Sequence, residues 1–237
     1  MKRLFIPTFG ASDWRRLLAD PERQWRATKS AYEAAVAWES ARRSPRGLPP
    51  AIAQVLDSSA AFRDASLLLG IPEHQVTLAG GGHSSQTDFW ALLDAPSIGV
   101  SSMAIESKAG EPFDALVSEW LKDAKPTSGK PARLQQLCDI LGMSEVDART
   151  CRYQLLHRPV AAILEARRFR VSNALFLVHA FGDNSDSFAE FKHWARILGV
   201  DASDGVVVPA GERGGVTLWL GWCSAPVAND QEIRDAV

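Results

Sequence analysis

The sequence predicts a mixed α/β (α+β) fold, in which a central mixed sheet is flanked by helices. Helical and strand patterns alternate along the chain, and the apolar residues 174–180 have the length and composition of a buried strand. The 237 residues, 46% apolar and 23% charged, exclude a disordered or collagen-like chain. A chain of this length can bury a full core, so we expect a single domain over residues 1–237.

The first elements are expected to be two helices. Residues 21–42 begin with Pro21, which suits the first turn of a helix, and their apolar residues fall on one side. Residues 50–69 are expected to form the second helix, and Gly70 is expected to end it. A stretch rich in proline and arginine is expected to form the loop between them.

Strands are expected next. Residues 75–79 are a short strand candidate, which the three glycines at 80–82 interrupt. Residues 87–93 and 99–108 are two further strands separated by a short turn. We therefore expect these two strands to pair as a hairpin.

Three helices are expected after the hairpin. Residues 112–122 begin with Pro112 and match the i, i+3, i+4, i+7, i+8 pattern of an amphipathic helix. Residues 131–141 form a shorter helix, and residues 145–167 form a longer one. Pro159 is expected to kink or split this longer helix, because proline lacks an N–H donor.

The last third of the chain is expected to complete the sheet. The buried strand over residues 174–180 is followed by a helix that Ser187 caps. Two closing strands follow, over residues 205–208 and 216–222. His179 lies within the buried strand and is expected to be a core histidine with its hydrogen bonds satisfied.

Charge and composition limit the location and the partners. The net charge of -2 argues against a protein that binds polyanions over its whole surface, but nucleic acid remains a candidate partner through one local basic face. The chain has no long apolar run and no recognisable secretory signal, so no membrane partner is expected. Three cysteines without CxxC spacing argue against a disulfide framework or structural zinc. We expect a cytoplasmic protein; its oligomeric state leaves no signal in the sequence.

Polar residues gather at the open end of the expected hairpin. Asp88 begins one strand, and Glu106 and Lys108 lie near the end of the other. Side chains alternate along a strand, so Glu106 and Lys108 share a face and Ser107 points to the opposite one. Carboxylates on neighbouring strands suit Mg²⁺ or Mn²⁺, and a nearby ammonium can orient water or stabilise charge on a phosphate. This pattern is typical of a metal-dependent phosphodiesterase.

An Asp on one strand followed by Glu-x-Lys on the next resembles the PD-(D/E)XK nuclease superfamily. The helix expected after Pro112 and the later buried strand add to the resemblance, which looks most like uncharacterised bacterial members. The resemblance implies a restriction-endonuclease-like core over about residues 25–182. A C-terminal helix and strands over residues 183–237 would be added to this core.

The resemblance also implies roles for the site residues. Asp88, Glu106 and the backbone carbonyl of Ser107 would bind Mg²⁺ or Mn²⁺, and Lys108 would orient the attacking water. Some members of the superfamily place a helix glutamate near the metal, and Glu33 is the matching candidate here.

Gln154 and Arg158 are candidates on the helix over residues 145–167. Other members of the superfamily use a helix glutamine near the substrate, usually in a Gln-x-x-x-Tyr pattern, which is absent at Gln154. Gln154 and Arg158 are four residues apart and share a helix face. They would contact either a phosphate together or each other.

Further candidates are basic residues and a glycine loop. Arg152 and Arg158 belong to an arginine-rich stretch and are candidate phosphate contacts, because a guanidinium binds two oxygens at once. The alternative is ordinary charge on a helix face. The glycines at 80–82 lack the ending of a nucleotide-binding P-loop. His83, directly after them, is either a general base or part of a flexible loop.

The predicted function is a metal-dependent nuclease that hydrolyses phosphodiester bonds of nucleic acid. One alternative is an inactive module of the same fold that binds nucleic acid or a protein partner. The other is an unrelated metal-dependent hydrolase of a small phosphoester.

Overall fold

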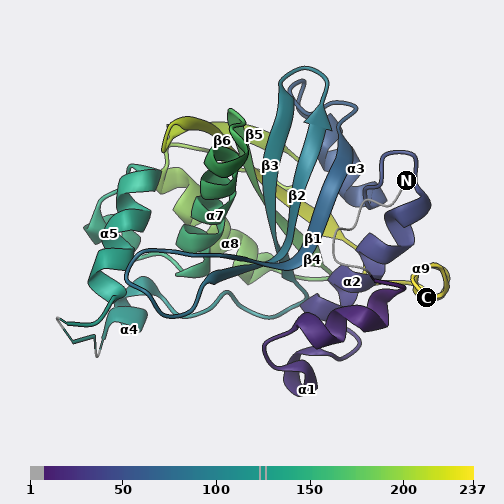
Figure 1. Ribbon diagram of the computed structural model, residues 1–237, viewed down its shortest axis with the longest axis horizontal. Helices are drawn as coiled ribbons and strands as arrows, with labels where there is room; N and C mark the ends of the chain where they lie inside the picture. The colour runs from purple at the N-terminus through teal and green to yellow at the C-terminus, as the bar shows by residue number, and fades with distance from the viewer. Residues whose placement is uncertain (1–7, 123, 126) are drawn as a thin grey trace.

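The computed structural model describes residues 8–122, 124–125 and 127–237, and it has the predicted mixed α/β fold (Figure 1). The strands are β1 (Ser66–Val76), β2 (Ser85–Ala95), β3 (Gly99–Lys108), β4 (Asn173–Phe181), β5 (Val207–Arg213) and β6 (Val216–Ala225). The helices are α1 (Pro21–Gln24), α2 (Ser30–Ser40), α3 (Pro50–Asp57), α4 (Val117–Leu121), α5 (Lys130–Leu141), α6 (Glu145–Ala148), α7 (Gln154–Phe169), α8 (Ser185–Ile197) and α9 (Asp230–Asp235), with the 3-10 helices η1 (Ala11–Leu17) and η2 (Ala41–Arg43).

The strands form one six-stranded sheet in the order β1-β2-β3-β4-β6-β5. The first three strands are antiparallel, β3, β4 and β6 run parallel, and β5 is antiparallel to β6. The strands β5 and β6 thus extend the same sheet beyond residue 182, the expected limit of the core. The β2–β3 hairpin is confirmed and stands beside the buried strand β4.

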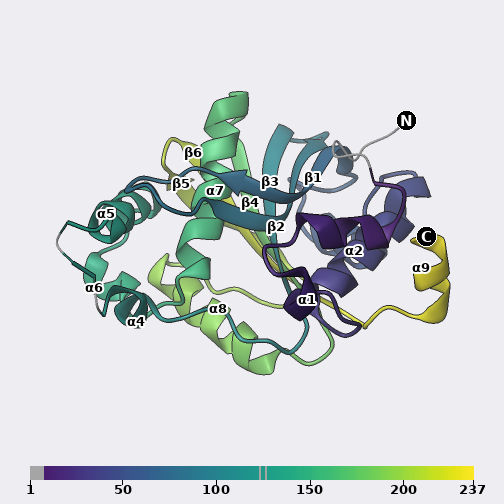
Figure 2. The ribbon, with the colours of Figure 1, turned by 60° about the horizontal axis from the view of Figure 1, so that its bottom comes forward.

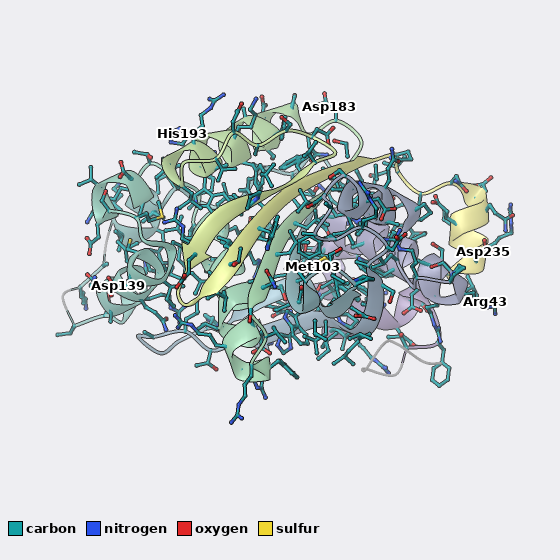
Figure 3. The ribbon with its side chains drawn as sticks, turned by 90° about the horizontal axis from the view of Figure 1, so that it is seen from above. Arg43, Met103, Asp139, Asp183, His193 and Asp235 are labelled. Atoms are coloured by element: carbon teal, nitrogen blue, oxygen red, sulfur yellow. The ribbon has the colours of Figure 1, made fainter. Side chains whose placement is uncertain are left out.

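Helices cover both faces of the sheet (Figures 1 and 2). The helices α5, α7 and α8 pack on one face, where Trp90 and Phe176 are buried. The helices α2 and α3 pack on the other, where Phe89 and Leu177 are buried, because side chains alternate along each strand. From above, the fully buried Met103 lies near the centre of the molecule (Figure 3). Each face therefore has its own apolar core.

The prediction that the second helix extends to residue 69 is wrong. Residues 66–76 form β1, the edge strand of the sheet, and α3 ends at Asp57. Leu67 is buried while Leu68 is exposed, which is the alternation of a strand. Gly70 lies inside β1 and does not end a helix. A Cβ at Gly70 would lie 2.3 Å from the ring of Phe89 on β2, so only glycine allows this close approach.

The predicted helix over residues 112–122 is mostly absent, since only Val117–Leu121 is helical. The preceding segment pairs with the residues just before α7: the N–H of Tyr153 donates to the carbonyl of Ala115, and the N–H of Val117 donates to the carbonyl of Cys151. The same pairing interrupts the predicted helix over residues 145–167, which becomes α6 and α7. Pro159 lies inside α7 and does not split it.

Other boundaries also differ from the prediction. The helix over residues 21–42 is divided into α1 and α2. Of the strand predicted over residues 75–79, only residues 75–76 are in a strand, as the end of β1. The strand predicted over residues 205–208 begins at Val207 and continues to Arg213. The helix α9, which packs against α2, was not predicted.

Within the described ranges, no helix has both the length and the apolarity to cross a membrane. Residues 1–7, part of the argument against a secretory signal, lie outside those ranges.

Candidate active site between the β2–β3 hairpin and helix α7

Three carboxylates follow one row across neighbouring strands. The antiparallel register of β2 and β3, continued by one residue, places Asp88 opposite Glu106. The register of β1 and β2 places Glu73 opposite Asp88 on its other side. The expected meeting of Asp88 and Glu106 is therefore confirmed, and a third carboxylate joins them.

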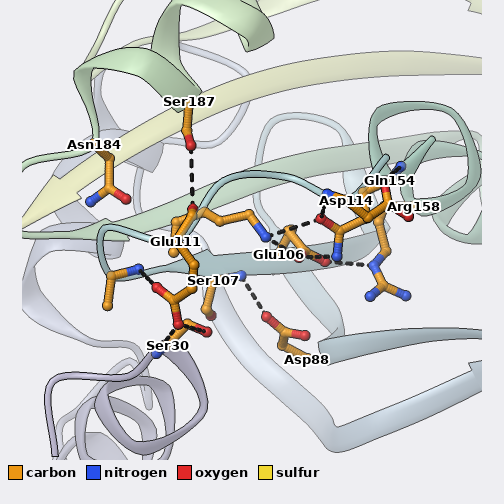
Figure 4. Close-up of polar contacts among 12 residues, drawn as sticks. Ser30, Asp88, Glu106, Ser107, Glu111, Asp114, Gln154, Arg158, Asn184 and Ser187 are labelled. Atoms are coloured by element: carbon orange, nitrogen blue, oxygen red, sulfur yellow. Dashed lines mark hydrogen bonds and ion pairs between the residues drawn. The ribbon is translucent and has the colours of Figure 1, made fainter. Parts of the chain in front are cut away.

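Within this row, Glu106 is the carboxylate that is fixed by three side-chain hydrogen bonds (Figure 4). Its Oε1 accepts hydrogen bonds from Lys108 Nζ at 2.7 Å and from Gln154 Nε2 at 2.8 Å, and its Oε2 accepts from Arg158 Nε at 2.5 Å. The Glu106 side chain is only 2% exposed. Burial would raise the pKa of Glu106, but the charges of Arg158 and Lys108 outweigh it and lower that pKa. Glu106 is thus an ionised carboxylate between two buried cations.

These contacts confirm two expectations about orientation. Lys108 and Glu106 share a face of β3, and Gln154 and Arg158 share a face of α7. Gln154 and Arg158 both contact Glu106, so the alternative in which they form a surface pair with each other is wrong. The hydroxyl of Ser107 points to the other face of the sheet, where it is buried without a hydrogen-bond partner among the described residues.

Unlike Glu106, Asp88 forms no ion pair with a lysine or arginine of the described residues. Its Oδ2 accepts the backbone N–H of Ser107 at 2.6 Å, and it has no ion pair within the part of the chain that the structure describes (Figure 4). Burial and the charge of Glu106 raise the pKa of Asp88 to about 7. Burial and the charge of Asp88 raise the pKa of Glu73 well above its usual value. Although the charges of Arg158 and Lys108 act in the opposite direction, Asp88 and Glu73 therefore hold a proton more readily than ordinary carboxyl groups.

A pocket of about 540 Å³ opens over Asp88 and Lys108. Its other acidic lining residues include Glu73, Glu111 and Asp114. Burial raises the pKa of Asp114 to about 6. The pocket is therefore rich in oxygen ligands and has one buried ammonium at its wall.

Two side chains fix the loop that borders this pocket. The N–H and Oγ of Ser30 both donate to Glu111 Oε1 at 2.9 Å, which ties the start of α2 to the loop after β3. The N–H of Gln154 donates to Asp114 Oδ1 at 2.9 Å, and the N–H of Asp114 donates to Gln154 Oε1 at 3.0 Å. Gln154 thereby links the loop, α7 and Glu106.

The oxygen donors suit a magnesium or manganese ion. Among the described residues, no three His, Cys, Asp or Glu side chains lie close enough together to hold a metal. Mg²⁺, however, keeps several waters and typically binds one or two carboxylates together with substrate phosphates. Asp88 lines the pocket and forms no ion pair with another described residue, whereas both oxygens of Glu106, opposite it, already accept hydrogen bonds. Asp88 is therefore the carboxylate that fits such an ion, with Glu106 as its neighbour.

Two predicted site residues lie elsewhere. Both carboxylate oxygens of Glu33 accept backbone N–H groups, from Thr28 at 3.1 Å and from Ala228 at 2.7 Å. Glu33 therefore anchors α2 to the C-terminal segment and does not line the acidic pocket. Arg152 was expected to contact a phosphate. Its guanidinium instead forms an ion pair with Glu190 at 2.5 Å.

His83 lies on the exposed loop after the glycines, at the wall of a second pocket beside the first. Its carbonyl accepts a hydrogen bond from Arg133 Nη1 at 2.8 Å. Sequence reasoning missed Arg133, Glu73 and Asp114. The sequence places Glu73 between the leucines at 67–69 and the glycine loop, which does not by itself indicate a site residue. Glu73 comes to lie beside Asp88 through the register of β1 with β2.

Comparison with known proteins gives a family for the chain. The family described as "Domain of unknown function (DUF6946)" matches residues 7–227. No curated protein and no solved structure gives a significant match. The matched segment contains all six strands and every residue of the acidic pocket. The chain therefore belongs to the family of the domain of unknown function DUF6946.

Proposed function

We propose that this protein is a metal-dependent nuclease that hydrolyses phosphodiester bonds of nucleic acid in the acidic pocket. The observation that carries the proposal is the meeting of Asp88 with the Glu106–Lys108 pair across one hairpin, beside a pocket that Asp88 and Lys108 line. The resemblance of the same three residues to the PD-(D/E)XK pattern supports it. Three buried free cysteines, Cys138, Cys151 and Cys223, support a cytoplasmic location as part of the proposal.

Each residue has a role in this proposal. Asp88 and Glu106 would hold Mg²⁺ or Mn²⁺, with the backbone carbonyl of Ser107 as a further ligand. The bound ion would lower the pKa of a water and neutralise charge on the phosphate. Lys108 lines the pocket and would orient that water through its ammonium. Arg158 keeps Glu106 ionised, and the N–H of Ser107 orients Asp88.

An inactive module of the same fold is the second candidate. It is favoured by the ion pairs of Glu106, because Lys108 and Arg158 already neutralise the carboxylate that would bind the metal. Such a module would bind nucleic acid or a protein partner without cleaving a bond.

The proposal predicts loss of cleavage in Asp88→Asn and Lys108→Met. Each variant is expected to cleave labelled oligonucleotides at least about a hundredfold more slowly in Mg²⁺ or Mn²⁺, because each removes a group that contacts the metal or the water. Circular dichroism checks that both variants fold. Glu190→Gln is the matched control, since it changes a carboxylate in an ion pair outside the pocket and is expected to cleave like the wild type.

Cleavage by both variants at the wild-type rate would overturn the assignment of this site. A wild-type protein that neither cleaves in either metal nor shows metal binding by calorimetry would favour the inactive module.

A further inference from the structure

Acidic residues outnumber basic ones in the lining of the first pocket, and basic residues outnumber acidic ones in the lining of the second. The volume of the second pocket is also about 540 Å³, within the range of roughly 300–1,000 Å³ that is typical of small-molecule sites. It shares Asp114 and Gln154 with the acidic pocket, so the two lie side by side. Its basic lining residues are Lys130, Arg133 and Arg158.

Two of these cations have no carboxylate partner among the described residues: Lys130 and Arg133, both near the start of α5. Lys130 Nζ donates to the carbonyl of Trp120 at 2.5 Å and lies 5.2 Å from the centroid of the Trp120 ring. The positive end of the α5 dipole adds to this charge. The pocket therefore offers uncompensated positive charge to an anion.

Arg133 shapes the glycine loop. Its guanidinium donates to the carbonyls of Ala79 at 3.1 Å and His83 at 2.8 Å, and also to that of Gly81. Gly80 lies against Gly129, where a Cβ would meet the Gly129 carbonyl oxygen at 2.0 Å. These contacts hold the loop against the start of α5.

The remaining wall is aromatic. The rings of Trp120 and Tyr153 stack with centroids 4.3 Å apart, and His157 follows with its centroid 4.5 Å from that of Tyr153. Burial and the nearby charges of Arg158 and Arg133 lower the pKa of His157 well below its usual value, so the imidazole is neutral. The pocket thus places cations beside aromatic side chains, and proteins that bind single-stranded nucleic acid use both kinds of group.

We propose that the second pocket binds one unpaired nucleotide of the substrate, next to the phosphodiester held in the acidic pocket. Lys130 would contact its phosphate, and the wall of Trp120 and Tyr153 would take its base. A base that is paired and stacked within a duplex cannot enter such a pocket. The inference rests on the proposed function for the neighbouring cleavage, and it assigns single-stranded nucleic acid as the substrate class.

Binding without cleavage tests the inference. The affinity of the full chain for a fluorescent single-stranded oligonucleotide and for the matching duplex is measured by anisotropy in EDTA at several salt concentrations. The wild type is expected to bind the single strand more tightly. Lys130→Gln is expected to weaken that binding about tenfold, the loss of one charge-assisted contact, and to reduce the salt slope by about 0.7.

Lys192→Gln is the matched control. Lys192 Nζ also lies over an aromatic ring, that of Phe188 at 5.6 Å, but on α8 outside both pockets. It is expected to leave the affinity unchanged. Equal effects of the two lysine variants, or tighter binding of the duplex, would overturn the inference.

Asp88→Asn separates this inference from the proposed function. It is expected to bind the single strand at least as tightly as the wild type while failing to cleave it. Binding that depends on Lys130 in a wild type that never cleaves would support the pocket and reject the nuclease. If cleavage depends on Asp88 but Lys130→Gln does not change binding, the nuclease is supported and the role of the second pocket is rejected.

Discussion

Glu106→Gln is expected to lower the free energy of unfolding by about 3–5 kcal/mol, the usual cost of removing one partner from a buried ion pair. Glutamine keeps the shape of the side chain but not its charge. The variant would leave Lys108 and Arg158, whose side chains are 6% and 9% exposed, without their carboxylate. Urea denaturation at neutral pH, followed by circular dichroism, measures the change.

Glu190→Gln again provides the control. Its partner Arg152 lies at 2.5 Å, as close as Arg158 lies to Glu106, but both side chains of this pair are partly exposed, at 25% and 30%. Water solvates the remaining charge there, so the loss is expected to stay below about 1 kcal/mol. Equal losses in Glu106→Gln and Glu190→Gln would contradict the role assigned to burial.

Arg158→Met in the Glu106→Gln background extends the argument. If the cost of Glu106→Gln comes from an unpaired buried guanidinium, removing that guanidinium is expected to restore part of the stability. A double variant even less stable than Glu106→Gln would show that Arg158 is stabilised chiefly by Glu73 and Asp88, whose charges also raise its pKa.

The sequence predicts those parts of the site that depend on residues close together in the chain. Glu106 and Lys108 share a face because side chains alternate along any strand, and Gln154 and Arg158 share a face because they are one helical turn apart. Asp88 meets Glu106 because a short turn joins their two strands. None of these inferences needs knowledge of the rest of the fold.

The errors arise where distant segments decide the local structure. The residues before α4 have a helical apolar pattern, but their backbone pairs with the segment before α7. The leucines at 67–69 suit a helix equally well, but the segment pairs with β2 from Ser66 to Val76 and is therefore a strand.

Distant contacts also decide the roles of charged groups. Glu33 and Arg152 carry suitable charges for the predicted site. Their partners, the backbone at Ala228 and the side chain of Glu190, come from parts of the chain that no local spacing connects to them. The same holds for Arg133, whose role depends on carbonyls about 50 residues earlier in the chain. Residue type alone therefore proposes candidates, and tertiary contacts select among them.

The buried side chain of His179 allows a prediction about stability in acid. Its Nδ1 has no hydrogen-bond partner within the described part of the chain, contrary to the expectation of a satisfied core histidine. Burial lowers the pKa of His179 to about 3. In the unfolded chain the imidazole binds a proton near pH 6.5, so the unfolded state holds more protons throughout the range between these values. This contribution to stability is fully present above pH 6.5 and is lost as the pH falls toward 3.

His179→Leu is therefore expected to be as stable as the wild type at pH 7 or more so, since leucine removes an unpaired polar atom beside the apolar side chains of Phe181 and Pro226. Between pH 6.5 and 4.5 the wild type is expected to lose about 2 kcal/mol more than the variant, because the unfolded imidazole becomes almost fully protonated over this range while the folded one stays neutral. Urea denaturation at both pH values measures the difference, and His193→Gln, a change at an exposed histidine on α8, is the control. His157 is buried and has a lowered pKa as well, so a smaller acid sensitivity remains in His179→Leu. Equal losses in wild type and His179→Leu would mean that acid protonates other groups first and that the buried imidazole does not govern acid stability.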